Sequence, residues 1–327
     1  MLAQVNDSGP FPAIMIKVSH LTKRFGSVTA VDDLSFEIAA GEIVGFLGPN
    51  GAGKTTTMRI LSCFLPATGG SIEIDGLDVF KQSVEVRRRI GYLPENCPLY
   101  PEMRVVEYLR YRAELKGLSG SRRRRRVYDV LSRCGLEDER RRLIGHLSKG
   151  YRQRVGLADS LLSEPAVLIL DEPGIGLDPG QRLEICRLIH GLAEDHTVLL
   201  STHLLADVER ICGRALIIND GRIVASDTPD NLVKKLKGHP RVTLEVHGPR
   251  HDVEAAFRRH SRVAQVHWRS VDDGWHLFEV ECDDGDDVRP DLFREVVAGG
   301  WQLREMRCEV IGLEDAFIAV TTEGLQE

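Results

Sequence analysis

The chain has 327 residues, 42% of them hydrophobic, and a net charge of −6 at pH 7, which is ordinary for a globular protein with one large and one smaller domain. The mild negative charge argues against bulk electrostatic binding to nucleic acid, and no run approaches the roughly 18 apolar residues of a membrane span. The seven cysteines are scattered without a C-x-x-C pair, so we expect reduced thiols in a cytosolic protein whose membrane association comes through a partner.

The chain opens with a polar stretch, residues 1–13, which we expect to be a loose tail because it lacks the basic-then-apolar order of a signal peptide. Residues 14–18 and 34–38 alternate in polarity as two strands, with a turn predicted at 23–26. Phe25 in that turn could stack on an adenine ring. By itself, an aromatic side chain in a turn is more often a lid on the core.

A glycine-rich segment follows a predicted buried strand, residues 42–47. Residues 48–55 fit the pattern G-x-x-x-x-G-K-[ST], and a helix is predicted from residue 54. Glycines let successive N–H groups point into one concavity, and the helix N-terminus adds positive partial charge. Lys54 is then expected to reach the β- and γ-phosphates, and the Thr55 hydroxyl to ligate Mg²⁺. A plain glycine-rich turn before a helix is the weaker alternative.

The middle of the chain changes to a helical pattern of apolar residues. Residues 71–76 read as a strand and turn, and residues 90–93 as a short strand before a proline-rich break. Residues 105–133 carry apolar side chains near a helical period, and residues 118–121 interrupt it. Within them, residues 122–126 are five consecutive arginines, which could grip nucleic acid or lipid phosphate; we favour a solvated helix face.

Strands and helices alternate again from residue 166. Apolar strands are predicted at 166–171 and 198–201, each followed by a helix, at 181–194 and 204–210, and a hairpin closes the domain near residues 216–224. This alternation predicts a parallel sheet covered on both faces, with ligands at the carboxyl ends of its strands.

After a linker near residues 237–240, the pattern becomes β-α-β-β-α-β, the ferredoxin-like arrangement, in a domain of residues 240–327. The acidic stretch 283–287 lacks the spacing of a calcium loop and is read as a turn. A short helix at 313–319 is predicted to close the chain.

Two acidic residues after the strand at 166–171 carry candidate phosphoryl-transfer chemistry. Asp171 is expected to bind Mg²⁺ through water and Glu172 to act as general base. Ser148 caps a predicted helix start, which is an anion site, and His203 ends the next strand within expected reach of the γ-phosphate. Capping serines and strand-end histidines are individually common, but all these features in one order indicate a nucleoside triphosphatase.

The sequence at this point resembles the ATP-binding cassette (ABC) family over residues 14–236. The phosphate loop, the Leu-Ser-x-Gly signature at 147–150, the Asp171–Glu172 pair, Asp178 and His203 match the family's motifs in order and spacing. The resemblance implies a P-loop α/β ATPase domain with a helical subdomain at about 96–163. It also implies a head-to-tail homodimer that sandwiches two ATP molecules.

The resemblance further assigns roles to single residues. Nucleotide contacts are expected from Phe25, Gly48, Asn50, Gly51, Gly53, Lys54, Thr55, Thr56, Ser148, Gly150 and Asp178, with Ser148 and Gly150 on the partner's nucleotide. Catalysis is expected from Glu172, His203 and Glu95, and Mg²⁺ ligation from Thr55, Asp171 and Glu95.

The sequence departs from the family pattern at a few positions. Lys149 and Tyr151 stand in the signature where glycine and glutamine are usual, Glu95 replaces a glutamine, and Gly174 stands where threonine is frequent. Together with Leu-Glu-Asp-Ala-Phe near the C-terminus, this combination resembles the export-type branch related to gliding-motility and multidrug transporters.

The resemblance implies an ATP-hydrolysing motor subunit, peripheral to the cytoplasmic face of the cell membrane, that drives a separate transmembrane permease. Residues 95–107 and the helices after them are the expected permease contact, and no nucleic acid is expected as a partner. The alternative is a soluble ABC ATPase that acts on ribosomes or nucleic acid through residues 122–126 and the C-terminal domain. A nucleotide sensor without hydrolysis is disfavoured by the intact Glu172. The cargo is not encoded in these motifs.

Overall fold

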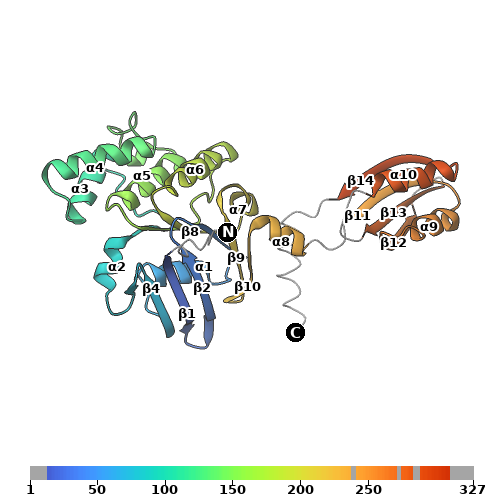
Figure 1. The fold of residues 1–327 in the computed structure, drawn as a ribbon. Coiled ribbons are helices and arrows are strands. Elements are labelled where there is room, and N and C mark those ends of the chain that lie inside the picture. The colour runs from blue at the N-terminus through green and yellow to red at the C-terminus, as the bar shows by residue number, and fades with distance from the viewer. Residues whose placement is uncertain (1–12, 237–240, 271–273, 283–287, 310–327) are drawn as a thin grey trace, which may run out of the picture. The chain divides into compact units, whose positions relative to one another are not determined.

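The computed structural model describes residues 13–236, 241–270, 274–282 and 288–309 (Figure 1). The chain divides into two units, Met1–Pro229 and Asp230–Glu327, each of which is described by itself. The sequence places the start of the second domain at residue 240, ten residues after Asp230, where the second unit starts.

A six-stranded sheet forms the centre of the first unit, in the order β10-β9-β3-β8-β7-β6. All neighbouring strands are parallel except β10, which pairs antiparallel with β9. Every residue of β3, β7 and β8 is buried, which explains why these strands appear in the sequence as unbroken apolar runs. The strands are β3 (Ile43–Leu47), β6 (Ile90–Leu93), β7 (Val167–Asp171), β8 (Thr197–Thr202), β9 (Arg214–Asn219) and β10 (Arg222–Asp227).

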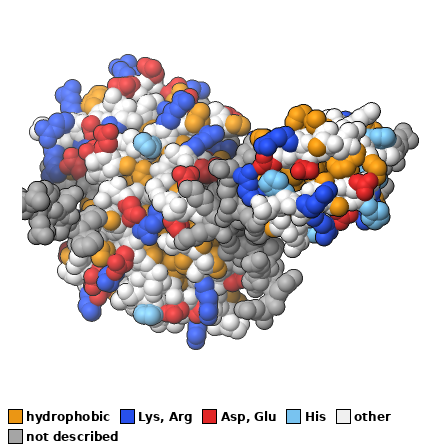
Figure 2. All heavy atoms as spheres, turned by 45° about the vertical axis from the view of Figure 1, so that its right-hand side comes forward, with side chains coloured by type: hydrophobic (Ala, Val, Ile, Leu, Met, Phe, Trp, Pro, Cys, Tyr) orange, Lys and Arg blue, Asp and Glu red, His pale blue; other side chains and the backbone are white. Residues whose placement is uncertain are grey.

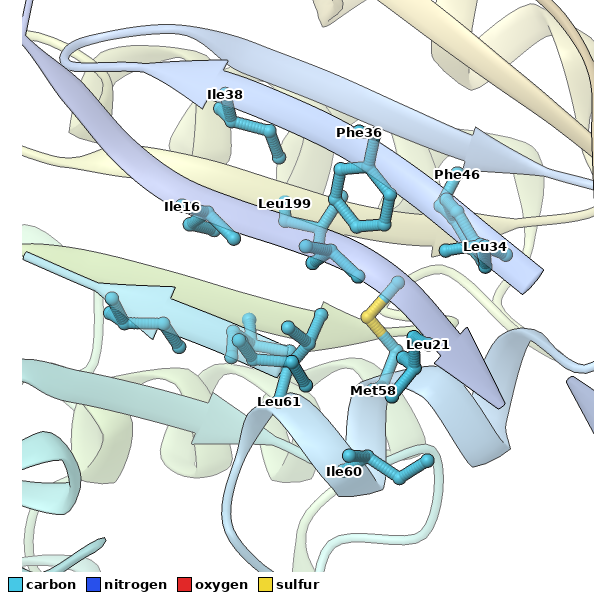
Figure 3. Packing of buried hydrophobic residues seen from close by; sticks show 14 of the residues in the cluster. Ile16, Leu21, Leu34, Phe36, Ile38, Phe46, Met58, Ile60, Leu61 and Leu199 are labelled. Atoms are coloured by element: carbon cyan, nitrogen blue, oxygen red, sulfur yellow. The ribbon is translucent and has the colours of Figure 1, made fainter. Parts of the chain in front are cut away.

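A second sheet in the same unit is antiparallel, in the order β2-β1-β4-β5. Its strands are β1 (Ile14–Phe25), β2 (Val28–Ala39), β4 (Gly69–Ile74) and β5 (Leu77–Asp78). Its inner side chains pack with Met58 of the helix α1 and with Phe46 and Leu199 of the central sheet (Figure 3). The turn predicted at 23–26 is wrong in extent: β1 continues to Phe25, which pairs with Val28, and only Gly26 and Ser27 turn.

Helices cover the central sheet and build a helical region. They are α1 (Lys54–Leu61), α2 (Ser83–Arg89), α3 (Val105–Leu115), α4 (Gly120–Arg133), α5 (Lys149–Leu161), α6 (Pro179–Leu192) and α7 (Leu205–Ile211), with a 3-10 turn at Ile144–His146. The helices α3, α4 and α5 contact one another. The predicted interruption of the helical stretch is confirmed, because α3 ends at Leu115 and α4 begins at Gly120. Within the described part of the chain, no helix is long and apolar enough to span a membrane.

The helix α8 (Pro229–Leu236) starts at the last residue of the first unit and lies otherwise in the second. The second unit continues as β11 (Arg241–His247), α9 (Arg250–Arg258), β12 (Val263–Ser270), β13 (Trp275–Cys282), α10 (Arg289–Ala298) and β14 (Gln302–Glu309). The four strands form an antiparallel sheet in the order β12-β13-β11-β14. This is the predicted ferredoxin-like arrangement. Val242, Leu244 and Val246 pack with Phe257 of α9 and Leu292 of α10 in its core. The predicted helix at 313–319, the acidic turn at 283–287 and the linker at 237–240 lie outside the described residues.

Candidate functional site

The glycine-rich loop lies between the end of β3 and the start of α1, at the carboxyl edge of the central sheet. Gly53 has φ +100°, and a Cβ built on it would lie 2.4 Å from the Ala30 carbonyl oxygen. A Cβ on Gly48 would lie 2.4 Å from the carbonyl oxygen of Ile218. Both positions therefore need glycine, because the loop is pressed between two neighbouring backbones.

Lys54, the first residue of α1, is buried at the base of this loop. Its ammonium donates hydrogen bonds to the carbonyl oxygens of Gly48 (2.7 Å) and Pro49 (3.1 Å) and lies 3.6 Å from Oε1 of Glu172. Burial lowers the pKa of Lys54, while the nearby carboxylates, Glu172 first, act to raise it. These contacts hold a cation at the mouth of a loop whose amides can bind an anion.

Asp171 ends β7 beside the start of α1. Its Oδ1 atom accepts hydrogen bonds from the Ser201 hydroxyl (2.6 Å) and from the Thr55 hydroxyl (3.3 Å). Its Oδ2 atom is buried and has no hydrogen-bond partner. Burial raises the pKa of this carboxyl group against the effect of both hydroxyls. A buried carboxylate oxygen without a partner, next to a hydroxyl, is a donor set that suits a hard divalent cation.

Glu172 follows in a left-handed backbone conformation, with φ +48°, which is uncommon for a residue other than glycine. Its amide donates to both the hydroxyl (3.0 Å) and the carbonyl oxygen (3.1 Å) of Ser201. Its Oε2 atom lies 2.8 Å from Nδ1 of His203. Glu172 is therefore held through both its backbone amide and its carboxylate, as expected for a side chain that must keep one orientation.

These elements border one cavity of about 370 Å³. The cavity is lined by Ala30, Asn50, Gly51, Gly53, Lys54, Thr55, Thr56, Glu95, Glu172 and Ile175. The structure thus brings together the predicted phosphate-loop residues, Glu95 and Glu172. Asp171 and His203 are one hydrogen bond away from lining residues, and Gly48 contributes the carbonyl that Lys54 binds.

Besides Asp171, His203 and Gly48, four predicted residues do not line this cavity: Phe25, Ser148, Gly150 and Asp178. Phe25 is about half exposed, and the Lys23 ammonium lies 4.9 Å from the centre of its ring. Ser148 and Asp178 cap the helices α5 and α6 by accepting from the amides of Tyr151 and Gln181, respectively. The structure of one chain therefore leaves the signature away from its own phosphate loop.

Sequence reasoning missed two kinds of contributor. Ala30 and Ile175 line the cavity, and no motif marks these two apolar residues. Ser201 connects Asp171 and Glu172 through a single hydroxyl. The available signal was its position at the end of the neighbouring strand, because parallel pairing of β7 and β8 sets Ser201 opposite Asp171.

Comparisons with known proteins agree with this geometry. A sequence profile of the family described as ABC transporter matches residues 31–174. The chain is 34% identical over 305 residues to a bacitracin transport ATP-binding protein from Bacillus licheniformis, which covers 88% of this chain and 98% of the relative. It is 34% identical over 321 residues to a Nod factor export ATP-binding protein from Burkholderia lata, with 97% and 100% of the two chains covered.

Solved structures show the same similarity over the first unit. An ATP-binding subunit of an ABC transporter superimposes with a TM-score of 0.61 at 32% identity, covering 68% of this chain and 92% of that one. A dimeric ATP-binding cassette in a post-hydrolysis state, bound to ADP and Pi, superimposes with a TM-score of 0.60 at 27% identity, covering 65% and 98%.

Proposed function

Because this chain belongs to the ABC transporter family and is an ATP-hydrolysing subunit, we propose that it is the motor of an exporter and drives a separate permease in the membrane. The observation that carries this proposal is the convergence of Lys54, Thr55, Asp171 and Glu172 on one cavity at the carboxyl edge of the sheet. The names of the relatives, which include export and resistance ATP-binding proteins, support the direction of transport.

Glu172 is the proposed general base. Its Oε2 atom is engaged by His203, and its Oε1 atom lies 3.6 Å from the Lys54 ammonium. Once Lys54 binds phosphate oxygens, Oε1 is left to polarise the water that attacks the γ-phosphate. His203 fixes the direction of the carboxylate, in the way that a third group orients a catalytic base. Lys54 binds the β- and γ-phosphates once its hydrogen bonds to the loop carbonyls are exchanged for phosphate oxygens.

The residues around Asp171 fit Mg²⁺. The Thr55 hydroxyl and the partnerless Oδ2 atom of Asp171 would hold the ion, with Glu95 beside them in the cavity. No group of three or more His, Cys, Asp or Glu side chains suited to a metal gathers among the described residues. Mg²⁺ usually combines one or two carboxylates with substrate phosphates. The ion would supply the positive charge that balances the phosphate oxygens.

The signature residues support a second copy of the chain as the partner at the nucleotide. Ser148 is exposed at the start of α5, whose first turn contains no acidic residue. A helix start of this kind attracts an anion, yet it does not line the cavity of its own chain. We therefore propose that Ser148 and Gly150 contact the ATP held by the phosphate loop of a second copy, and that Asp178 lies at the same junction.

A second hollow, of about 310 Å³, supports the proposed permease contact at residues 95–107. It is lined by Arg59, Phe64, Tyr92, Leu93, Pro94, Asn96, Cys97, Pro98, Leu99, Tyr108, Arg112, Gly156 and Asp159. Phe64 at its rim is 76% exposed. An apolar hollow beside the segment that follows β6 fits an apolar segment from the cytoplasmic side of a permease. This contact would hold the chain at the cytoplasmic face of the membrane.

The catalytic part of the proposal is tested with Glu172→Gln. The control is Glu194→Gln, which removes one negative charge from an exposed residue outside the cavity. The first variant should bind ATP like the wild type while its turnover falls by about 10²- to 10⁴-fold, the usual contribution of a general base. The control should hydrolyse ATP normally. Hydrolysis by Glu172→Gln at the wild-type rate would remove Glu172 from this role.

The transport part is tested by co-expression with the permease encoded nearest to this gene. We expect the two chains to purify together in detergent, and ATP hydrolysis to change when the permease is present. Solitary behaviour of the chain in membranes and in detergent would contradict the motor function.

A further inference from the structure

The helical region carries a basic pocket that the nucleotide site does not use. The pocket has a volume of about 410 Å³. It is lined by Arg104, Val106, Glu107, Arg110, Tyr128, Arg140 and Arg141. Four arginines and a single acidic residue therefore line one concavity. This ratio differs from the rest of the surface, where most arginines of the described chain have an acidic partner.

Two of the four arginines are free to bind a ligand. Arg104 donates to the backbone carbonyl of Arg141 and lies 3.9 Å from Glu107, and Arg140 donates to the carbonyl of Glu137 at 2.5 Å. The guanidinium groups of Arg110 and Arg141 have no hydrogen bond or ion pair to any described residue. Backbone carbonyls do not cancel a full charge, so the pocket keeps an excess of positive charge.

The five-arginine run on α4 adds to this surface. Arg122, Arg123 and Arg126 pair with Glu164, Glu114 and Asp129, respectively. Arg124 and Arg125 are exposed and make no ion pair with the described part of the chain. They lie one helical turn before Tyr128, which lines the pocket, and residues three and four apart are neighbours on a helix surface.

The predicted solvated face thus consists of two parts: paired arginines that brace the helical region, and unpaired ones beside the pocket. In Figure 2, Lys and Arg side chains gather along the upper left edge of the first unit, on the side where Figure 1 places α3 and α4. Acidic groups are close by in the turn that leads to Arg140. Glu139 is paired with Arg142 at 3.1 Å, and Glu137 and Asp138 are exposed but do not line the pocket.

A phosphate group is the ligand that this chemistry recognises best. Guanidinium groups bind phosphate oxygens through two parallel N–H bonds, and a tyrosine hydroxyl can add a third donor. The pocket shares Arg104 and Glu107 with the segment 95–107 that we propose to contact the permease, and it would therefore lie close to the bilayer. We propose that this pocket binds the phosphate of an anionic lipid headgroup, an inference that rests on the proposed function.

Nucleic acid is the less favoured ligand. Sequence-tolerant binding of single strands combines a basic groove with several stacking aromatic side chains. Here the pocket is one concavity with one aromatic ring, Tyr128, and the chain as a whole has a net charge of −6. A lipid headgroup needs only one phosphate site next to the membrane.

The test is co-sedimentation of the purified full chain with vesicles of phosphatidylcholine, with or without phosphatidylglycerol. The variant is Arg110→Gln with Arg141→Gln. Arg87→Gln with Arg88→Gln on α2 is the matched control, because it removes the same charge from two exposed arginines outside the pocket. Each basic residue near an anionic surface contributes about 1 kcal/mol, so the pocket variant should bind anionic vesicles about tenfold or more weakly. The control should change by less than about threefold.

Equal losses in the two double variants would show that only overall charge matters and would overturn the proposal. Vesicle binding that does not depend on phosphatidylglycerol would also overturn it. The same holds if the pocket variant loses binding to single-stranded RNA or to soluble glycerol phosphate while its vesicle binding stays unchanged. Permease-stimulated ATP hydrolysis in detergent separates the two levels. If the pocket variant shows both normal permease-stimulated ATP hydrolysis and unchanged vesicle binding, the proposed lipid site is wrong and the motor function stands.

Discussion

Ser201→Ala removes a hydroxyl that joins the two acidic residues of the nucleotide site. The Ser201 hydroxyl donates to Oδ1 of Asp171 at 2.6 Å and accepts from the amide of Glu172 at 3.0 Å. The amide keeps a second acceptor in the Ser201 carbonyl, at 3.1 Å. The main loss therefore falls on the carboxylate of Asp171, which is 1% exposed.

The magnitude follows from burial and charge. A hydrogen bond to a charged group contributes about 1.5–3 kcal/mol, and here water cannot replace the missing donor. We expect the free energy of unfolding of the first unit to fall by this amount at neutral pH. Burial already raises the pKa of Asp171. As the pH falls through this raised pKa, Asp171 becomes protonated, and the hydroxyl no longer stabilises a charged group.

The pH dependence has a definite sign. An acid whose pKa is raised by folding binds more protons in the native state than in the unfolded state. Its burial therefore costs no stability below the unfolded-state pKa, and the full cost is present above the native-state pKa. Ser201 reduces that cost while Asp171 is charged. The difference between wild type and Ser201→Ala should therefore be largest near neutral pH and should shrink in acid. The acidic limb of the ATPase pH profile should also move to higher pH in the variant.

The chain provides separate probes for its two units. All six tyrosines lie within residues 92–151, in the first unit, and all three tryptophans lie within residues 268–301, in the second. Urea unfolding followed by tyrosine absorbance should report the change, while tryptophan fluorescence should not move. Ser160→Ala is the matched control, because the Ser160 hydroxyl is also buried but bonds only the neutral carbonyl of Leu157. An equal destabilisation by both variants, or one that is independent of pH, would refute the reasoning.

Two further predictions concern the loop and the helix cap. Gly53→Ala should abolish ATP binding or lower the free energy of unfolding by more than about 1 kcal/mol, because its Cβ would lie 2.4 Å from the Ala30 oxygen at φ +100°. Gly191→Ala in α6 is the control and should be neutral or stabilising, because no atom lies within 4 Å of the new Cβ. A Gly53→Ala variant with normal ATP affinity and normal stability would contradict this packing. Asp178→Ala should destabilise the first unit by about 1 kcal/mol in tyrosine-detected unfolding, since its side chain caps α6. Asp178→Asn should restore the cap, and restored stability without restored ATP hydrolysis would separate a role at the nucleotide from the capping role.

The parts of the site that the sequence predicts are those that depend on a short stretch of chain. The loop around Lys54 is defined by its glycine spacing and by the strand and helix on either side, all within about 20 residues. The ferredoxin-like order of the second unit is likewise readable from alternating strands and turns. Periodicity is a local property, and these predictions need no knowledge of which strands become neighbours.

Other features depend on pairing between distant segments. Sequence alone does not show that β1, β2, β4 and β5 leave the central sheet and form an antiparallel one, because alternating and apolar strands fit either. The connection of Ser201 to Asp171 requires the register of β7 against β8. The helix α2 is only seven residues long and buries one side chain, Val86, so its amphipathic pattern is too short to detect.

The contacts of the signature explain how a site built from two chains could be coupled to the catalytic base. A Cβ built on Gly176, which has φ +65°, would lie 2.3 Å from Nζ of Lys149, and one built on Gly150 would lie 2.9 Å from Oε1 of Gln181. The start of α5 is therefore packed against the segment that leads into α6. That segment is joined to Glu172 by the hydrogen bond from the amide of Ile175 to the Glu172 carbonyl, at 3.1 Å. An anion bound at the start of α5 would then lie beside a segment whose residue Gly176 is only four positions after the base, Glu172.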